Sequence, residues 1–262
     1  MSCLIRRPGI VPFALLVVAF SINCYELGGG GSPSTYVHNP LEINSIAINS
    51  SGHIFVGAKN NLVYRSLDDG NTWVRSDSGF TITDVSALAI NSIGYIFAGT
   101  SDGVFRSDDN GISWAQISNP EINDLAINSS GHLFAVGDGI FRSVNDGDSW
   151  VRVMDTEVYN IRPYTLTIDS DDHIYVGGNG GYVIHSGDNG ENWALVNGYM
   201  GNTVRVNAIV ISSDDHVLAG TNHGVLRAEK IGDNWTETNK GMTYPFIHAL
   251  TINSGGDIFA GT

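Results

Sequence analysis

Charged residues are scarce in this chain, and this excludes several classes of protein. They make up 15% of the 262 residues, against roughly 25% in ordinary soluble domains, and lysine occurs only three times. With glycine at 32 positions, the composition argues against long surface helices, which favour Glu, Lys and Ala. No apolar run reaches the roughly 20 residues that a membrane-spanning helix needs. An aromatic content of 10% excludes a disordered chain.

Positive charge is the scarcer sign. The formal net charge is −14, and the chain beyond residue 23 holds 11 basic and 27 acidic residues. Such a surface repels phosphate backbones and anionic lipid headgroups. We therefore expect no nucleic-acid partner, and membrane contact only through a lipid anchor.

The N-terminus predicts export from a bacterial cytoplasm. Arg6 and Arg7 precede an apolar run over 10–20, and Cys24 follows it. Residues 1–24 are therefore interpreted as a signal peptide, and the Gly-rich residues 25–33 as a flexible tether. The segment resembles a bacterial lipoprotein signal in which Cys24 is lipidated. It departs from that pattern at Ser21 and Asn23, so secretion after cleavage stays open, and the protein is expected in the cell envelope or outside the cell.

A repeat of about 40 residues fills the remaining chain. Residues 45–57 and 87–99 match almost position for position, and further copies begin near Leu125, Leu166, Ile209 and Leu250. The five tryptophans of the protein are spaced by 41, 36, 43 and 42 residues. Each unit contains four short apolar segments separated by turn residues, which is typical of four antiparallel strands. The period predicts an all-β propeller over 34–262, with one four-stranded blade per unit.

A specific motif precedes each tryptophan, with the pattern S-x-D-x-G-x-[TS]-W. It is carried by Ser66, Asp68, Gly70, Trp73, Ser107, Asp109, Gly111, Trp114, Ser143, Asn145, Gly147, Trp150, Ser186, Asp188, Gly190, Trp193, Gly232 and Trp235. It resembles the Asp-box, or bacterial neuraminidase repeat, and the whole repeat is similar to photosystem II stability/assembly factor-like propellers and bacterial sensor propellers. The resemblance implies that the boxes lie on the outer rim. The motif chemistry indicates structural roles: Asp fixes a turn, Gly supplies positive φ, and Trp starts the outer strand and packs between sheets.

The number of repeats is not whole. Residues 34–262 divided by the mean period give about 5.7 units. Thr35-Tyr36-Val37 aligns with an outermost strand, and the chain stops after two strands of a sixth blade. We expect five complete blades and a partial sixth in a C-terminally truncated piece. A six-bladed ring lacking one strand is the alternative.

Two columns of the repeat hold residue types that occur in active sites and metal centres. Arg65, Arg106, Arg142 and Arg227 share one column, with His185 in the fifth place, and His53, His132, His173 and His216 share another. Residues repeated in every blade are interpreted as packing elements, because equivalent positions are spread around the ring. No catalytic residue, metal site or cofactor is predicted.

The connections between blades vary most, and propellers usually bind ligands on that face. Aromatic residues and arginine anchor interfaces. The candidate binding residues are Tyr159, Arg162, Tyr164, Tyr199, Arg205, Lys240 and Tyr244. The expected function is a non-catalytic binding or assembly scaffold for a protein or glycan. The alternatives are a sialidase-like glycoside hydrolase and the sensor part of a larger signalling protein.

Overall fold

All regular structure in the described part of the chain is β-strand. The computed structural model describes residues 42–59, 62–80, 84–155, 161–196, 198, 200–229, 234–243 and 246–262. The predicted outermost strand over 35–37, the signal peptide and the tether lie outside these residues. No helix among the described residues has the length and hydropathy that a membrane crossing requires.

The strands form successive antiparallel sheets in which each strand pairs with the next along the chain. Blades 1 to 3 comprise β1 (Ile43–Ile48), β2 (Ile54–Ala58), β3 (Leu62–Ser66), β4 (Val74–Arg75), β5 (Val85–Ile90), β6 (Ile96–Thr100), β7 (Gly103–Ser107), β8 (Ala115–Gln116), β9 (Ile122–Ile127), β10 (Leu133–Gly137), β11 (Gly139–Ser143) and β12 (Val151–Met154). Blades 4 to 6 comprise β13 (Pro163–Ile168), β14 (Ile174–Gly178), β15 (Val183–Ser186), β16 (Ala194–Leu195), β17 (Val206–Ile211), β18 (His216–Thr221), β19 (Gly224–Glu229), β20 (Thr236–Glu237), β21 (Ala249–Ile252) and β22 (Ile258–Gly261).

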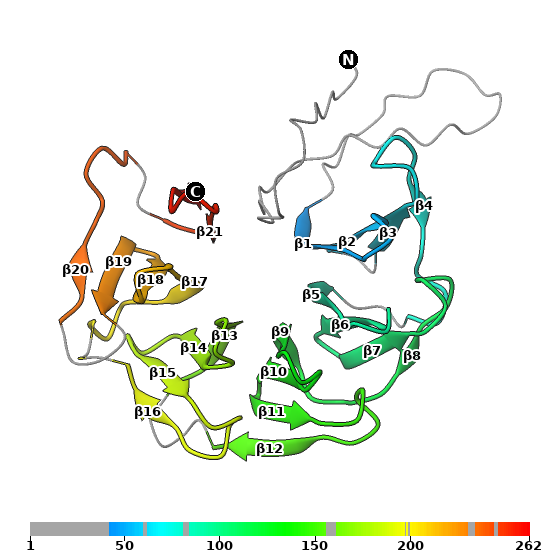
Figure 1. The fold of residues 1–262 in the computed structure, drawn as a ribbon, viewed down its shortest axis with the longest axis horizontal. Helices are drawn as coiled ribbons and strands as arrows, with labels where there is room; N and C mark the ends of the chain where they lie inside the picture. Colours follow the sequence, from blue (N-terminus) through cyan, green and yellow to red (C-terminus); the bar gives the residue numbers. More distant parts are fainter. Residues whose placement is uncertain are drawn as a thin grey trace.

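The sheets are arranged as blades around a common axis, as Figure 1 shows. The first strand of every blade lies innermost, and consecutive innermost strands lie side by side. The predicted fold class is therefore confirmed: the chain is a β-propeller with five four-stranded blades and a sixth of two strands. The connections from each blade to the next lie on one face of the propeller, here called the loop face. The turns between first and second strands and the box turns lie on the opposite face, here called the turn face.

Side-chain amides join the innermost strands. Asn44 Nδ2 donates to the carbonyl oxygen of Val85 at 3.0 Å, and Asn123 Nδ2 donates to that of Pro163 at 2.8 Å. Asn207 repeats the contact with Ile247 at 2.8 Å. Because each bond crosses from one blade to the next, it fixes the spacing of the inner ring.

The second strand of each complete blade forms the core. Every residue of β6, β10 and β14 is buried. Phe55 and its counterpart Phe97 have no exposed surface, whereas the corresponding Phe259 of β22 is 47% exposed. The difference arises because Phe55 packs beneath Gly111 of the following blade, and β22 has no following blade among the described residues.

The outer strands begin later than the sequence predicts. Trp114 was expected to start the outer strand, but β8 begins at Ala115. In blade 2 the main-chain N–H of Trp114 bonds outside its own sheet, donating to the carbonyl oxygen of Ser78 in blade 1 at 2.9 Å. The backbone of Trp114 therefore connects blades 1 and 2, one residue before β8 begins.

Candidate functional site

The box residues form a closed network inside one turn. In the second box, Ser107 Oγ donates to Asp109 Oδ1 at 2.8 Å and accepts the N–H of Gly111 at 2.9 Å. Asp109 also accepts the N–H of Ser113 at 2.9 Å and its hydroxyl at 2.6 Å. The first and fourth boxes repeat this network around Asp68 and Asp188. The carboxylates are therefore saturated by local donors.

Two consecutive residues in each of the first four boxes adopt positive φ. Asp69, Asn110, Asp146 and Asn189 have φ between 54° and 61°, and the glycine after each has φ between 76° and 86°. Sequence reasoning assigned positive φ to the glycine alone. Asn and Asp tolerate the left-handed region better than other non-glycine residues, which explains their presence in this column.

Hydrogen bonding sets the charge state of the box. Partial desolvation raises the pKa of Asp109, but bonds from Ser113, Ser107 and Ile112 outweigh it and hold the pKa at about 2. The bonds from Thr72 and Ser66 likewise lower the pKa of Asp68. A carboxylate held ionised by its own turn is a poor general acid. The third box achieves the same turn with neutral Asn145, whose Oδ1 accepts the N–H of Ser149 at 3.0 Å.

Tryptophan and arginine connect the second, third and fourth boxes to the preceding blade. Trp114 is 5% exposed and packs with Phe55 and Val63 of blade 1, while its Nε1 donates to the carbonyl oxygen of Ser76 at 2.8 Å. Arg106 Nη1 donates to the carbonyl oxygen of Asp146 in the next blade at 2.7 Å. Arg65 and Arg142 make the same contact. These arginines lie at the seams between blades and on different blades.

Three of the candidate binding residues lie close together on the loop face. Arg162, Tyr164 and Arg205 lie at the start of the innermost strands of blades 4 and 5. Arg162 and Arg205 are exposed, and Tyr164 is half-buried. The Arg205 guanidinium carbon lies 4.1 Å from the centre of the Tyr164 ring. Lys240 is exposed on the connection to blade 6. Tyr159, Tyr199 and Tyr244, together with Gly232 of the fifth box and Cys24, lie outside the described residues.

Sequence reasoning missed a charge reversal around the inner ring. The residue just before each innermost strand is acidic in blades 1 to 3, at Glu42, Asp84 and Glu121, and basic in blades 4 and 5, at Arg162 and Arg205. Comparing this column across the repeat would have revealed the reversal. Within this column Glu121 pairs with Arg162 of the next blade, and Glu42 pairs with Lys59.

Arg205 differs from the other cations in its pairing. The following cations have a carboxylate within 4.0 Å: Lys59 with Glu42, Arg75 with Asp77, Arg106 with Asp148, Arg142 with Glu191, Arg152 with Asp138, Arg162 with Glu121, and Arg227 with Asp214. Arg65 donates to a main-chain carbonyl. Arg205 is exposed, and its guanidinium lies over the ring of Tyr164. It is the only described arginine that combines these two features with the absence of a carboxylate within 4.0 Å among the described residues. In a chain with 27 acidic residues, an arginine in this state is available to an external anion.

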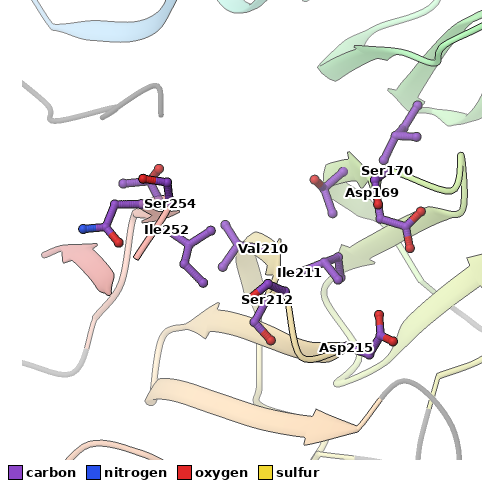
Figure 2. Close-up of a pocket in the computed structure, with 13 residues that line it drawn as sticks. Asp169, Ser170, Val210, Ile211, Ser212, Asp215, Ile252 and Ser254 are labelled. Carbon is purple, nitrogen blue, oxygen red and sulfur yellow. The ribbon is translucent and has the colours of Figure 1, made fainter. Parts of the chain in front are cut away.

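The turn face carries a hollow of about 460 Å³. Figure 2 shows that residues from three successive blades line it, including Asp169, Ser212, Asp215 and Ser254. This hollow lies opposite the face where sequence reasoning placed the binding residues. Its lining is formed by the turns between first and second strands, which the repeat supplies in every blade.

One grouping among the described residues has metal-ligand geometry. The ligand atoms of Asp169, Asp171 and His173 lie within 4.8 Å of one another at the turn of blade 4. Sequence reasoning treated these acids as turn residues. The four histidines of the column, in contrast, are distributed over different blades.

The fold defines a β-propeller of repeated four-stranded antiparallel blades. No protein-family model matches the sequence, and no curated protein matches it. Among solved structures, the chain is similar to YCF48 bound to D1 peptide, with a TM-score of 0.67 and 16% identity, covering 87% of this chain and 78% of that one. It is also similar to the extracellular domain of a putative one component system from B. thetaiotaomicron, with a TM-score of 0.73 and 14% identity, covering 87% of this chain and 33% of that one.

An enzyme is also among the similar structures. The GH74 xyloglucanase from Xanthomonas campestris gives a TM-score of 0.66 and 19% identity, covering 83% of this chain and 44% of that one. The chain thus spans less than half the length of the xyloglucanase and of the one component system protein. At these identities the likeness shows the fold, which occurs in a peptide-bound protein, an extracellular domain of a putative one component system and a xyloglucanase alike.

Proposed function

We propose that this chain is an exported, non-catalytic β-propeller that binds a protein partner on its loop face and acts as a binding or assembly scaffold. The observation that carries the proposal is Arg205, which is exposed to solvent and has its guanidinium carbon over the Tyr164 ring, 4.1 Å from the ring centre. Stacking restricts the guanidinium, so less conformational entropy is lost when a partner binds. Its edge remains free to donate bidentate hydrogen bonds to a carboxylate.

The charge reversal on the loop face favours a protein segment over a glycan as the partner. Arg205 attracts an anionic group, while Glu42 and Glu121, which are paired with Lys59 and Arg162, offer carboxylate oxygens to a cationic group. A polypeptide supplies charges of both signs along one chain, and neutral glycans supply neither. The similar structure of YCF48 bound to D1 peptide supports peptide binding by this fold.

The distribution of arginine and acid supports a non-catalytic role. A sialidase-like site needs three arginines converging on one substrate carboxylate. Here Arg65, Arg106 and Arg142 are engaged at three different seams. The box carboxylates are saturated by their own turns. We further propose that the protein functions outside the cytoplasm, where lipidation at Cys24 anchors it to a membrane through the tether over 25–33.

The partner class is tested by binding the full chain to two immobilised sets of probes. One set is an array of 12-residue peptides graded from basic to acidic, and the other is a glycan array. We expect saturable binding to acidic peptides. Arg205→Ala and Tyr164→Ala are expected to weaken it by about 10- to 100-fold, as for other interface anchors.

A matched exposed arginine serves as the control. Arg75 lies on the outer strand of blade 1 and is 61% exposed, so Arg75→Ala removes the same charge far from Tyr164 and should bind as the parent does. Equal binding by the Arg205→Ala and parent proteins, or binding confined to the glycan array, would contradict the proposal. Turnover of aryl sialosides or xyloglucan by the parent protein would replace it with the hydrolase alternative.

A further inference from the structure

The seam between blades 4 and 5 differs from the three seams before it. At the seam of blades 1 and 2, three side chains of blade 1 converge on Asn110 of the second box. Asn49 Nδ2 lies 3.0 Å and His53 Nδ1 3.3 Å from Asn110 Oδ1. Arg65 Nη1 lies 2.7 Å from the main-chain oxygen of Asn110. The box residue is therefore the shared partner of an amide, an imidazole and a guanidinium.

The seam of blades 3 and 4 repeats the same convergence. Asn128 Nδ2 lies 3.2 Å and His132 Nδ1 3.1 Å from Asn189 Oδ1, and Arg142 Nη1 lies 2.5 Å from the main-chain oxygen of Asn189. The seam of blades 2 and 3 keeps the bonds from Asn91 and Arg106 to Asp146. The register of the repeat thus directs these positions of each blade toward one point of the next.

Blade 4 carries different chemistry at the same three positions. The amide is replaced by Asp169, the histidine is kept as His173, and the arginine is replaced by His185. In the sequence, Ile231 of blade 5 aligns with Asn110 and Asn189, the residues before the box glycine. Ile231 lies outside the described residues, and an isoleucine side chain has no oxygen or nitrogen. The three positions therefore hold metal-ligating groups at the seam where the sequence has lost the polar box residue.

The described geometry brings these groups together. Asp169 is 5% exposed in its side chain, and its Oδ2 lies 3.2 Å from His173 Nδ1. Asp171 adds a second carboxylate, with all three ligand atoms within 4.8 Å. The rings of His173 and His185 have their centres 6.5 Å apart. His185 Nδ1 is inaccessible to solvent and has no hydrogen-bond partner, which is costly for a buried polar atom.

We propose that Asp169, His173 and His185, with Asp171 as a further ligand, bind a zinc-like divalent cation at the seam of blades 4 and 5. Carboxylate and imidazole are ligands that zinc accepts at about 2.0–2.2 Å. With Zn–N bonds of about 2.0–2.1 Å at a tetrahedral angle, two imidazoles on one ion have ring centres about 5 Å apart, so the side chains of His173 and His185 would have to approach each other by about 1.5 Å from the observed 6.5 Å. Tyr175, whose hydroxyl lies 3.4 Å from Asp169 Oδ2, would orient the carboxylate. The cation replaces the bonds that the arginine and the box residue make at the other seams.

The site is tested by zinc titration calorimetry and thermal unfolding of the full chain without an affinity tag. Cys3 and Cys24 are replaced by Ser in all variants, because thiolates also bind zinc. We expect saturable binding of one Zn²⁺ and a rise in Tm with zinc concentration. Asp169→Asn and His185→Arg install the residues that the repeat uses elsewhere, so the fold should be retained. Each is expected to weaken binding by more than about tenfold.

His132→Ala is the matched control, since it removes the equivalent histidine from a seam with an intact box residue. It should leave zinc affinity unchanged. Bound Co²⁺ should show the absorption of a tetrahedral site in the parent and lose it in His185→Arg. Absence of saturable zinc binding, or equal affinity in the parent, Asp169→Asn and His185→Arg, would overturn the proposal. The loop-face proposal involves other residues and is unaffected by either result.

Discussion

Arg142 Nη1 lies 2.5 Å from the main-chain oxygen of Asn189 in the next blade. The same guanidinium nitrogen lies 2.7 Å from the carboxylate of Glu191. One side chain thus connects the third strand of blade 3 to the box turn of blade 4. Because its side chain is only 16% exposed, water replaces this contact poorly when it is lost.

Arg142→Ala is therefore expected to lower the free energy of unfolding by about 1.5–3 kcal/mol, the usual worth of hydrogen bonds to charged groups. Urea denaturation followed by tryptophan fluorescence measures the loss. The exposed Arg75 is the control, and Arg75→Ala should change stability by no more than about 0.5 kcal/mol. Equal effects of the two substitutions would show that the seam contact contributes nothing.

Trp114→Ala should destabilise the protein by about 3–5 kcal/mol, because it empties a buried site between blades 1 and 2. Trp114 is 5% exposed, whereas Trp73 of the first box is only half-buried. Trp73→Ala in the same repeat column is accordingly expected to cost less. Guanidinium denaturation of both variants gives the comparison, and a larger loss at Trp73 would contradict the packing argument.

Asp109→Asn should remove part of the acid sensitivity of the protein. The pKa of Asp109 is about 2 in the folded state against an ordinary value of 3.8. A depressed pKa contributes stability above the unfolded value, and the contribution is lost as pH falls from about 4 to about 2. Tm measured from pH 5 to pH 2 should fall less steeply in Asp109→Asn than in the parent.

The third box offers the reciprocal experiment. It carries neutral Asn145 in the same geometry, so Asn145→Asp introduces a carboxylate with the same local donors. This variant should lose Tm more steeply than the parent below about pH 4. Parallel pH profiles for the parent, Asp109→Asn and Asn145→Asp would exclude a role for box ionisation in acid stability.

Asp124 should give the opposite pH dependence. It lies between blades 3 and 4, where Oδ2 accepts the N–H of Leu166 at 2.9 Å and Oδ1 accepts the N–H of Leu125 at 2.9 Å. Burial raises its pKa to about 6, although bonds from Leu166, Leu125 and Thr165 pull it down. A raised pKa contributes stability below the unfolded value of 3.8 that is lost as pH rises through about 6.

The measurement is Tm of the parent and Asp124→Asn between pH 4 and pH 7.5. The difference in Tm, parent minus variant, is expected to decrease as pH rises from about 4 to about 6 and to stay constant above that. A difference that is constant over the whole range would show that Asp124 does not titrate with a raised pKa.

The repeat made much of the fold predictable. Four apolar segments per unit and a tryptophan about every 40 residues gave the blades and the all-β class, because strand periodicity and turn chemistry are local properties. Boundaries were less accurate. The outer strand of every complete blade begins one residue after its tryptophan. In blade 2 the backbone of Trp114 bonds to Ser78 of the preceding blade, and no local pattern reports a bond between blades.

The candidate sites were predicted in part. Arg162, Tyr164 and Arg205 were selected by residue type on a variable connection, but the stacking of Arg205 on Tyr164 depends on how two adjacent blades meet. The grouping of Asp169 with His173 and His185 was missed. Its significance appears only when the seams are compared in space, since the partner of each position lies 40 to 61 residues away.

The sequence by itself determined the blade, because each unit's apolar alternation and its serine, aspartate and glycine act within a few residues. Tertiary structure alone decided which surfaces of successive blades face each other. Packing around an axis turned the column of Arg65, Arg106 and Arg142 into seam contacts, left Arg205 exposed, and gathered acid and histidine at one seam. These outcomes depend on burial and on distances between blades, which a linear pattern does not contain.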